Sequence, residues 1–169
     1  MRLNGKTAIV TGGASGFGAG IVRKFVAEGA RVLIADMNLE GGEALAAELG
    51  ESVAAIQTNV ARNDDVAAMT VAALEAFGRI DILVNNAGTT HMPAPMEEIS
   101  EEDFDRVLAV NAKSVYLTAR HIVPLLKAQK AGAILNVAST AAVSPRPRLS
   151  WYNASKGWMI TATKTMAVE

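Results

Sequence analysis

Short strand-like runs of apolar residues alternate with helix-like segments along the whole sequence, and this alternation constrains the fold more than any other feature. Glycines such as Gly29, Gly50 and Gly78 stand where the helices should end. Alternation of this kind produces a parallel sheet with right-handed crossovers, and such sheets bind ligands beyond the carboxyl ends of their strands. The sequence therefore predicts an α/β fold built on a doubly wound parallel sheet, as one domain over residues 1–169. The expected strands cover residues 7–10, 31–35, 52–58, 80–84 and 133–137.

Composition narrows the class of protein. Hydrophobic residues make up 50% of the chain and aromatic residues only 5%, which suits small aliphatic side chains packed on a buried sheet. A formal net charge of −1 gives no basic footprint for nucleic acid. The absence of cysteine excludes disulfides and thiolate metal sites, and His121 has no second ligand near it, so we expect no metal. With no signal peptide and no apolar run of about 20 residues, we expect a cytoplasmic protein without a membrane partner.

Local signals suggest where several helices begin and where one is broken. Asn63 or Asp64 is expected to cap the third helix, and Ser100 with Asp103 resembles a capping box that opens a long helical stretch. Pro124 is expected to kink or interrupt the later part of that stretch.

A glycine-rich segment, Thr-Gly-Gly-Ala-Ser-Gly-Phe-Gly over residues 11–18, follows the first strand and opens the first helix. Glycines permit a tight turn there and let the backbone approach a pyrophosphate, while the amino end of the helix offers unpaired N–H groups to the anion. A glycine-rich turn without a ligand is the alternative, and the position between strand and helix favours the phosphate site.

Tyr152 and Lys156 stand four residues apart and therefore share one face of a predicted helix. A phenol with a pKa near 10 is a poor base at neutral pH, but a nearby ammonium group favours the phenolate. Such a tyrosine can give a proton to a carbonyl oxygen or take one from an alcohol. The pair alone is usually an ordinary helix surface, so its meaning depends on the other motifs.

Those motifs together resemble the short-chain dehydrogenase/reductase family. The evidence is the Thr-Gly-x-x-x-Gly-x-Gly spacing over 11–18, the Asn-Asn-Ala-Gly element at 85–88, and Ser139 placed thirteen residues before Tyr152 in Tyr-x-x-x-Lys. The resemblance covers essentially the whole chain and is nearest to 3-oxoacyl-(acyl-carrier-protein) reductases and sugar or polyol dehydrogenases. It implies a Rossmann-type, three-layer α/β/α domain and an NAD(P)-dependent dehydrogenase or reductase acting on CH–OH groups, with Tyr152 as general acid/base.

The resemblance also implies roles for individual residues. Asn111, Ser139, Tyr152 and Lys156 form the expected catalytic set, in which Ser139 binds the substrate oxygen and Asn111 holds a relay water beyond Lys156. Tyr152 and Lys156 are also expected to contact the cofactor. The remaining expected cofactor-binding residues are Thr11, Gly12, Ser15, Gly16, Phe17, Gly18, Asp36, Met37, Asn59, Val60, Asn86, Ala87 and Gly88.

Asp36 ends the second strand, where a carboxylate accepts hydrogen bonds from the adenosine ribose hydroxyls and repels a 2′-phosphate. No Lys or Arg stands beside it to neutralise a phosphate, so NAD(H) is favoured over NADP(H), although a turn or capping role for Asp36 is the alternative. Asn59 stands where the family usually has Asp, so we expect weaker adenine binding there.

Two other functions remain open: a nucleotide-sugar epimerase or dehydratase, and a catalytically silent nucleotide-binding module. His91 is expected to be a solvated loop residue, with a place at the border of the substrate pocket as the alternative. Trp151 and Trp158 are expected to be packing residues, either within the chain or in a subunit interface. The resemblance implies a homodimer or homotetramer in the complete form. The helix over 151–169 receives no stop signal and only five strands are found. We therefore expect the natural protein to continue with further strands and a substrate lid, and residues 1–169 alone to have little turnover and poor solubility.

Overall fold

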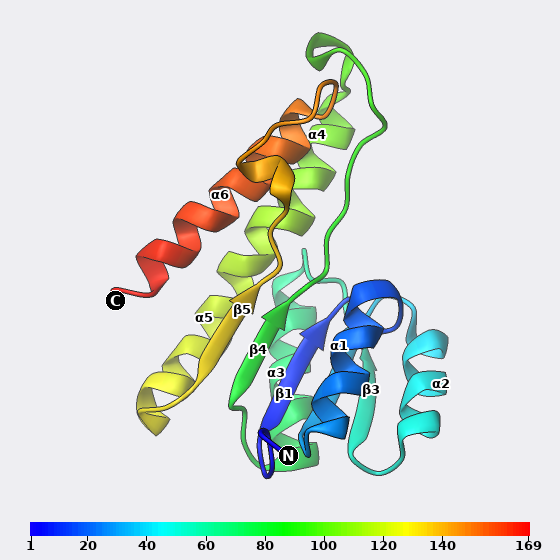
Figure 1. The fold of residues 1–169 in the computed structure, drawn as a ribbon, viewed down its shortest axis with the longest axis vertical. Helices are drawn as coiled ribbons and strands as arrows, with labels where there is room; N and C mark the ends of the chain where they lie inside the picture. The colour runs from blue at the N-terminus through cyan, green and yellow to red at the C-terminus, as the bar shows by residue number, and fades with distance from the viewer.

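The computed structural model describes residues 1–169 and contains a five-stranded parallel sheet between two layers of helices (Figure 1). The strands follow the spatial order β3-β2-β1-β4-β5, so the direction in which the chain builds the sheet reverses beside β1. A reversal of this kind opens a crevice at the carboxyl edge between β1 and β4. The strands are β1 (Thr7–Thr11), β2 (Arg31–Asp36), β3 (Val53–Gln57), β4 (Ile82–Asn85) and β5 (Ala133–Asn136).

Six α-helices and three short helical turns complete the fold. None of the helices combines the length and the apolar character that a membrane crossing requires. The helices are α1 (Gly16–Ala27), α2 (Leu39–Leu49), α3 (Asn63–Phe77), α4 (Glu101–Leu108), α5 (Ser114–Gln129) and α6 (Ser150–Met166). The turns are the 3₁₀ turns η1 (Met96–Glu98) and η3 (Thr140–Ala142) and the π-helical turn η2 (Ala109–Lys113), which joins α4 to α5.

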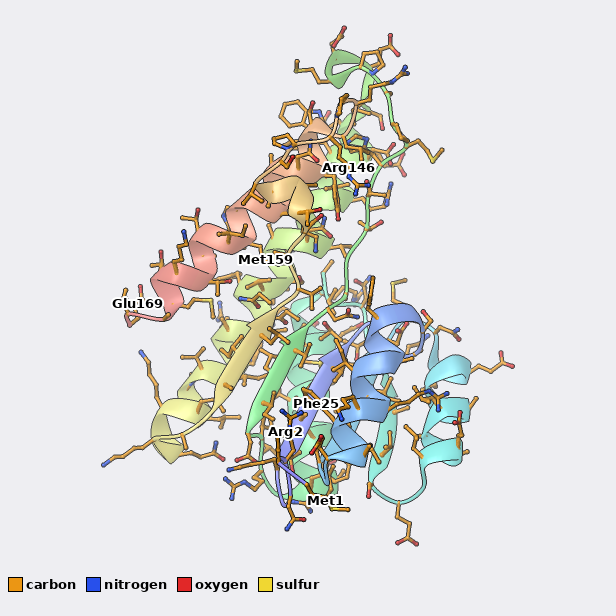
Figure 2. All side chains as sticks on the ribbon, viewed as in Figure 1. Met1, Arg2, Phe25, Arg146, Met159 and Glu169 are labelled. Carbon is orange, nitrogen blue, oxygen red and sulfur yellow. The ribbon has the colours of Figure 1, made fainter.

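The core consists of two apolar clusters, one on each face of the sheet. Ala8 and Val10 of β1 belong to the cluster that includes Val22 of α1, whereas Ile9, between them, belongs to the cluster of α3 and α5. Successive side chains of a strand point to opposite faces, so one short run of small aliphatic residues supplies both clusters. Figure 1 accordingly shows α1 in front of the sheet and α3 behind it, and Figure 2 shows Phe25 on α1. The predicted three-layer α/β/α architecture is confirmed.

The long helical stretch is interrupted at a different place from the one expected. Pro124 lies inside α5, which runs without a break from Ser114 to Gln129. The irregularity falls instead at η2, a π-helical turn that contains Asn111. Such turns are frequent at functional sites, because they change the direction of side chains and release backbone groups from the helical hydrogen bonds. The expectation that Pro124 interrupts the helix was therefore wrong, and the alternative, a kink at Pro124, stays a prediction.

Helix starts were predicted with mixed success. Ser100 caps α4 as expected, since its hydroxyl accepts a hydrogen bond from the backbone N–H of Asp103 at 3.1 Å. The capping residue of α3 is Arg62, with no side-chain capping bond, and both Asn63 and Asp64 lie inside the first turn. At that position Asp64 does not cap a backbone amide. Its negative charge instead interacts favourably with the positive end of the helix dipole.

One edge of the sheet is open at β5, whose only strand neighbour is β4. A groove of about 750 Å³ lies beside it, between the later turns of α5 and α6, and its lining includes Val123, Leu126, Ile134 and Met166. An unpaired edge flanked by apolar side chains is an aggregation hazard, and the expected poor solubility of residues 1–169 alone stays a prediction. The groove lies along the side of the sheet, whereas the crevice beside β1 opens at its carboxyl edge.

Candidate active site

The glycine-rich loop begins where β1 ends and leads directly into α1. Gly12 and Gly16 have positive φ values of 63° and 51°, which side chains other than glycine rarely adopt. A Cβ on Gly18 would overlap the carbonyl oxygen of Gly12, so the first turn of the helix fits closely against the loop. Ser15 precedes the helix without a side-chain capping bond, and no acidic residue occupies the first turn. The amino end of α1 is therefore free to bind an anion.

Asn86 and Thr11 join the carboxyl ends of β1 and β4. The side-chain amide of Asn86 donates to the carbonyl oxygens of Thr11 and Gly12, both at 2.9 Å. The hydroxyl of Thr11 accepts the backbone N–H groups of Asn86 and Ala87, both at 3.1 Å. A Cβ on Gly12 would lie only 2.9 Å from the Cα of Ala87. These contacts fix the glycine loop against the Asn-Asn-Ala-Gly element across the crevice.

Asp36 ends β2 with its carboxylate held in place by the backbone. One oxygen accepts from Ala14 N–H and the other from Asn38 N–H, each at 3.0 Å. No Lys or Arg forms a salt bridge with this carboxylate, in contrast to the other strand-end acid, Asp81. Each carboxylate oxygen can accept a second hydrogen bond. Asp36 thus plays the predicted turn-stabilising part and still presents acceptors to a ligand.

A groove of about 660 Å³ runs along this edge of the sheet and contains most of the expected cofactor-binding residues. The expected cofactor-binding residues that do not line the groove are Thr11, Gly16, Tyr152 and Lys156. The hydroxyl of Thr11 instead accepts hydrogen bonds from the backbone of Asn86 and Ala87. The expected residues that line it are Gly12, Ser15, Phe17, Gly18, Asp36, Met37, Asn59, Val60, Asn86, Ala87 and Gly88.

The groove also includes residues that the sequence motifs did not indicate. Some of these residues are neighbours in sequence of Asp36, Asn59 or Gly88, and could have been predicted from that position. Arg106 had no local signal: it enters from α4 and donates to the hydroxyl of Thr89 at 2.7 Å. The additional residues are Ala35, Thr58, Ala61, Thr89, Arg106, Ala109 and Val110.

Asn59 is partly committed to the protein itself. Its side-chain oxygen accepts the backbone N–H of Ala61 at 3.0 Å, and its own N–H donates to Asp65 at 2.9 Å. One lone pair of that side-chain oxygen remains for a ligand amino group. The expectation of weakened binding at this position stays a prediction.

Lys156 is buried with a single hydrogen-bond partner. Its side chain is 4% exposed, and its ammonium donates to the carbonyl oxygen of Val137 at 2.9 Å. Burial lowers the pKa of Lys156 from its ordinary value, because desolvation penalises the charged form. A Cβ on Gly88 would lie 3.3 Å from the Lys156 nitrogen and 3.5 Å from the side-chain oxygen of Asn111. Gly88 therefore allows Lys156 and Asn111 to approach the same point at the end of the groove.

Asn111 is fully buried in the π-helical turn, and its side chain is occupied. Its amide nitrogen donates to the carbonyl oxygen of Thr89 at 2.8 Å and to the hydroxyl of Ser155 at 2.9 Å. Its oxygen accepts the backbone N–H of Thr89 at 2.8 Å. Both amide hydrogens are thus used, and only acceptor capacity remains for a water molecule.

Ser139 and Tyr152 flank the segment that joins β5 to α6. Ser139 lies three residues past β5 and precedes η3, where its hydroxyl accepts the N–H of Ala141 at 3.1 Å and keeps its own proton to donate. Tyr152 lies in the first turn of α6, on the same face as Lys156, and η3 packs against α6. Neither hydroxyl is exhausted by protein partners.

One expectation about the flanking residues was wrong. His91 is 1% exposed rather than solvated; one ring nitrogen contacts the carbonyl oxygen of Met92 at 2.8 Å and the other has no partner. Trp151 packs as expected, edge-on against Phe104 with ring centroids 5.3 Å apart. Trp158 is 44% exposed, and its packing in a subunit interface stays a prediction.

Comparison with known proteins agrees with this arrangement. The sequence model of a family described as short chain dehydrogenase matches residues 6–169. The chain belongs to the short chain dehydrogenase family. As a member, it is an oxidoreductase of the dehydrogenase/reductase type, and the resemblance seen in the sequence motifs is confirmed.

Relatives of known name or structure lie close to this member of the family. It is 46% identical to 4-formylbenzenesulfonate dehydrogenase of Comamonas testosteroni, covering 100% of this chain and 68% of that protein. The crystal structure of a 3-ketoacyl-(acyl-carrier-protein) reductase from Brucella melitensis complexed with NADH superposes with a TM-score of 0.96 at 45% identity, over 98% of this chain and 70% of that one. A short chain dehydrogenase/reductase from Burkholderia phymatum in complex with NAD has a TM-score of 0.93 at 33% identity, over 98% and 60%.

Proposed function

We propose that this short-chain dehydrogenase uses NAD(H) to interconvert a secondary alcohol and a ketone. The observation that carries the proposal is the groove of about 660 Å³. It joins the glycine loop and Asp36 to Gly88, which lies against Lys156 and Asn111. The NADH and NAD complexes of two similar proteins support the same use of this groove.

The residues that line the groove fit a dinucleotide. The free amino end of α1 and the close approach allowed by Gly12 and Gly18 suit a pyrophosphate. Asp36 has the acceptors for two ribose hydroxyls, and its unneutralised charge would repel a 2′-phosphate. On these grounds we assign NAD(H) in preference to NADP(H).

The nicotinamide ring, when bound, would supply or accept the hydride. Tyr152 would give a proton to the carbonyl oxygen during reduction and take it back from the alcohol during oxidation. Ser139 has a free hydroxyl proton with which to stabilise charge that develops on that oxygen.

Lys156 and Asn111 support this proton transfer. Lys156 follows Tyr152 by four residues on the same face of α6. Its ammonium would stabilise the negative charge that develops when the tyrosine gives up its proton, and would also bind a ribose hydroxyl. Asn111 takes part in a proton relay only through acceptor atoms, because both hydrogens of its amide are donated to the protein.

Direct assay of nicotinamide absorbance tests the proposal. The natural protein should reduce NAD⁺ with a member of a panel of secondary alcohols, or oxidise NADH with the corresponding ketone. A nucleotide-sugar epimerase would convert its substrate with no net change in NADH, and a silent module would bind NADH without turnover. Either of these results would contradict the proposed function.

We also assign self-association to the surface of α5 and α6. Tyr116 and Trp158 are 53% and 44% exposed on these helices, and exposed apolar side chains mark a protein contact where they form one patch. Light scattering on the natural protein should give the mass of a dimer or tetramer, and Trp158→Arg should lower that mass.

A further inference from the structure

Ser155, one residue before Lys156, lies at a junction between two of the site residues. It is 0% exposed in the middle of α6. Its hydroxyl donates to the carbonyl oxygen of Tyr152 at 2.7 Å and accepts from the amide of Asn111 at 2.9 Å. One oxygen atom therefore connects the backbone at Tyr152 to the side chain of Asn111.

The same contact completes the hydrogen bonding of Asn111. The other hydrogen of that amide and the amide oxygen are paired with the backbone of Thr89. Ser155 is thus the only side chain bonded to the Asn111 amide, and it joins the π-helical turn η2 to α6. Without its hydroxyl, a buried N–H of Asn111 would have no partner, which a packed interior does not tolerate well.

We propose that Ser155 is a positioning residue for the reaction, holding Asn111 and the turn of α6 that carries Tyr152 and Lys156 in their working arrangement. This inference rests on the proposed function. Small displacements of reacting groups are costly in enzymes: a shift of about 1 Å can reduce turnover by about 100-fold. Ser155 acts through the residues that it holds and not directly on the substrate, because its hydroxyl is enclosed and both of its hydrogen bonds go to the protein.

The competing explanation is that Ser155 is an ordinary helix serine that bonds back to a preceding carbonyl. α6 contains a matched residue that separates the two. Thr163, two turns later, donates to the carbonyl oxygen of Met159 at 2.7 Å and accepts from the amide of Asn136 at 2.8 Å. It makes the same two kinds of bond as Ser155, but to residues outside the proposed site.

The kinetic test compares hydroxyl removal at the two positions in the natural protein. Ser155→Ala should lower kcat at least about tenfold with little change in KM for NAD⁺, since Ser155 does not itself line the cofactor groove. Ser155→Thr, which keeps the hydroxyl, should recover most of kcat, and Thr163→Ala should retain it. In an Asn111→Ala background, Ser155→Ala should have almost no further effect, because the two act through one bond.

A second measurement does not depend on turnover. Hydrogen exchange of the Thr89 amide, which Asn111 protects, should accelerate in Ser155→Ala and stay unchanged in Thr163→Ala. If the alanine variant fails to fold, Ser155→Cys keeps the volume with a weak acceptor and should show the same two effects. If the wild-type protein binds NADH but turns over nothing, the proposed function fails and the Thr89 exchange still reports whether Ser155 holds Asn111.

The proposal is overturned if Ser155→Ala keeps wild-type kcat, or if its Thr89 amide exchanges at the wild-type rate. Equal losses of kcat in Ser155→Ala and Thr163→Ala would also overturn it, because they would reduce Ser155 to general support of the helix.

Discussion

The two ends of the sheet treat their buried charges in opposite ways. At the amino end, Asp81 is 4% exposed and surrounded by donors: the N–H of Thr7 at 3.0 Å, the guanidinium of Arg79 at 2.6 and 2.9 Å, and Lys6 at 3.6 Å. At the carboxyl end, Lys156 is equally buried, but its only partner is a neutral carbonyl.

The pKa values follow from this difference. Burial by itself would raise the pKa of Asp81, but the hydrogen bonds of Thr7 and Arg79 and the charges of Arg79 and Lys6 outweigh it and lower the pKa. Burial lowers the pKa of Lys156, and nothing offsets it. The amino end therefore uses charge for stability, whereas the carboxyl end keeps charge uncompensated, as sites that bind or transform ligands commonly do.

The largest expected effect is at the carboxyl end. Tyr152→Phe should lower kcat by at least about 100-fold, the usual scale for a general acid/base, while NADH binding stays unchanged. Lys156→Ala should damage both, because the ammonium serves both. Steady-state kinetics and fluorescence titration of NADH measure the two quantities. Near-normal turnover in Tyr152→Phe would show that the proton comes from another group.

At the amino end, a substitution should cost stability and not activity. Asp81→Asn keeps the size of the side chain but loses charge-assisted hydrogen bonds, and we expect the free energy of unfolding to fall by about 2 kcal/mol. Asp105→Asn, on the exposed surface of α4, is the matched control and should change it by less than about 0.5 kcal/mol. Urea unfolding at neutral pH checks both. If Asp81→Asn and Asp105→Asn had the same free energy of unfolding, the charge of Asp81 would not stabilise the amino end of the sheet.

The pH dependence of this effect has a definite sign. Because the pKa of Asp81 is lower in the folded state, its charge contributes stability above the unfolded pKa of about 4 and loses it as the pH falls through the folded value. The difference between wild type and Asp81→Asn should therefore shrink in acid.

A smaller effect concerns cofactor choice. Wild type should bind NADH at least about tenfold more tightly than NADPH, equivalent to about 1.4 kcal/mol. Asp36→Ala should reduce this difference in affinity between the two cofactors. Glu40→Ala removes an exposed carboxylate four residues away and should leave the difference in affinity between NADH and NADPH unchanged. Fluorescence titration with NADH and with NADPH measures the two affinities. Equal or tighter NADPH binding by wild type would contradict the proposal that Asp36 selects NAD(H).

The smallest expected effect is on stability in alkali. The pKa of Lys156 is lowered in the folded state, so the cost of burying its charge is present at neutral pH and is relieved as the pH rises toward the ordinary value of 10.5. The stability of wild type relative to Lys156→Met should rise over that alkaline range. Lys164→Met, an exposed lysine on the same helix, should show no such trend in parallel urea titrations.

Much of this protein was readable from sequence, because the relevant information is local. Apolar runs and glycine stops located all five strands, with ends that moved by one or two residues. Position after a strand and before a helix identified the loop over residues 11–18, and spacing along one helix paired Tyr152 with Lys156. Most of the expected cofactor-binding residues line one groove because parallel strands bring their carboxyl ends to a common edge.

Other features were decided only when distant segments packed together. His91 is buried although its neighbours in sequence indicate a polar loop. Arg106 lines the groove from a helix that was expected, but no motif indicated that this residue would reach the groove. Pro124 fits inside α5, while the helix changes geometry at Asn111, which bonds to Thr89 and Ser155.

The physical reason is the range of the interactions. Periodicity and turn chemistry act over a few residues and so are written in the sequence. The hydrogen bonds of Lys156 with Val137, of Asn111 with Ser155 and of Asp81 with Thr7 join residues 19, 44 and 74 positions apart, respectively. Only the folded chain brings such residues within bonding distance.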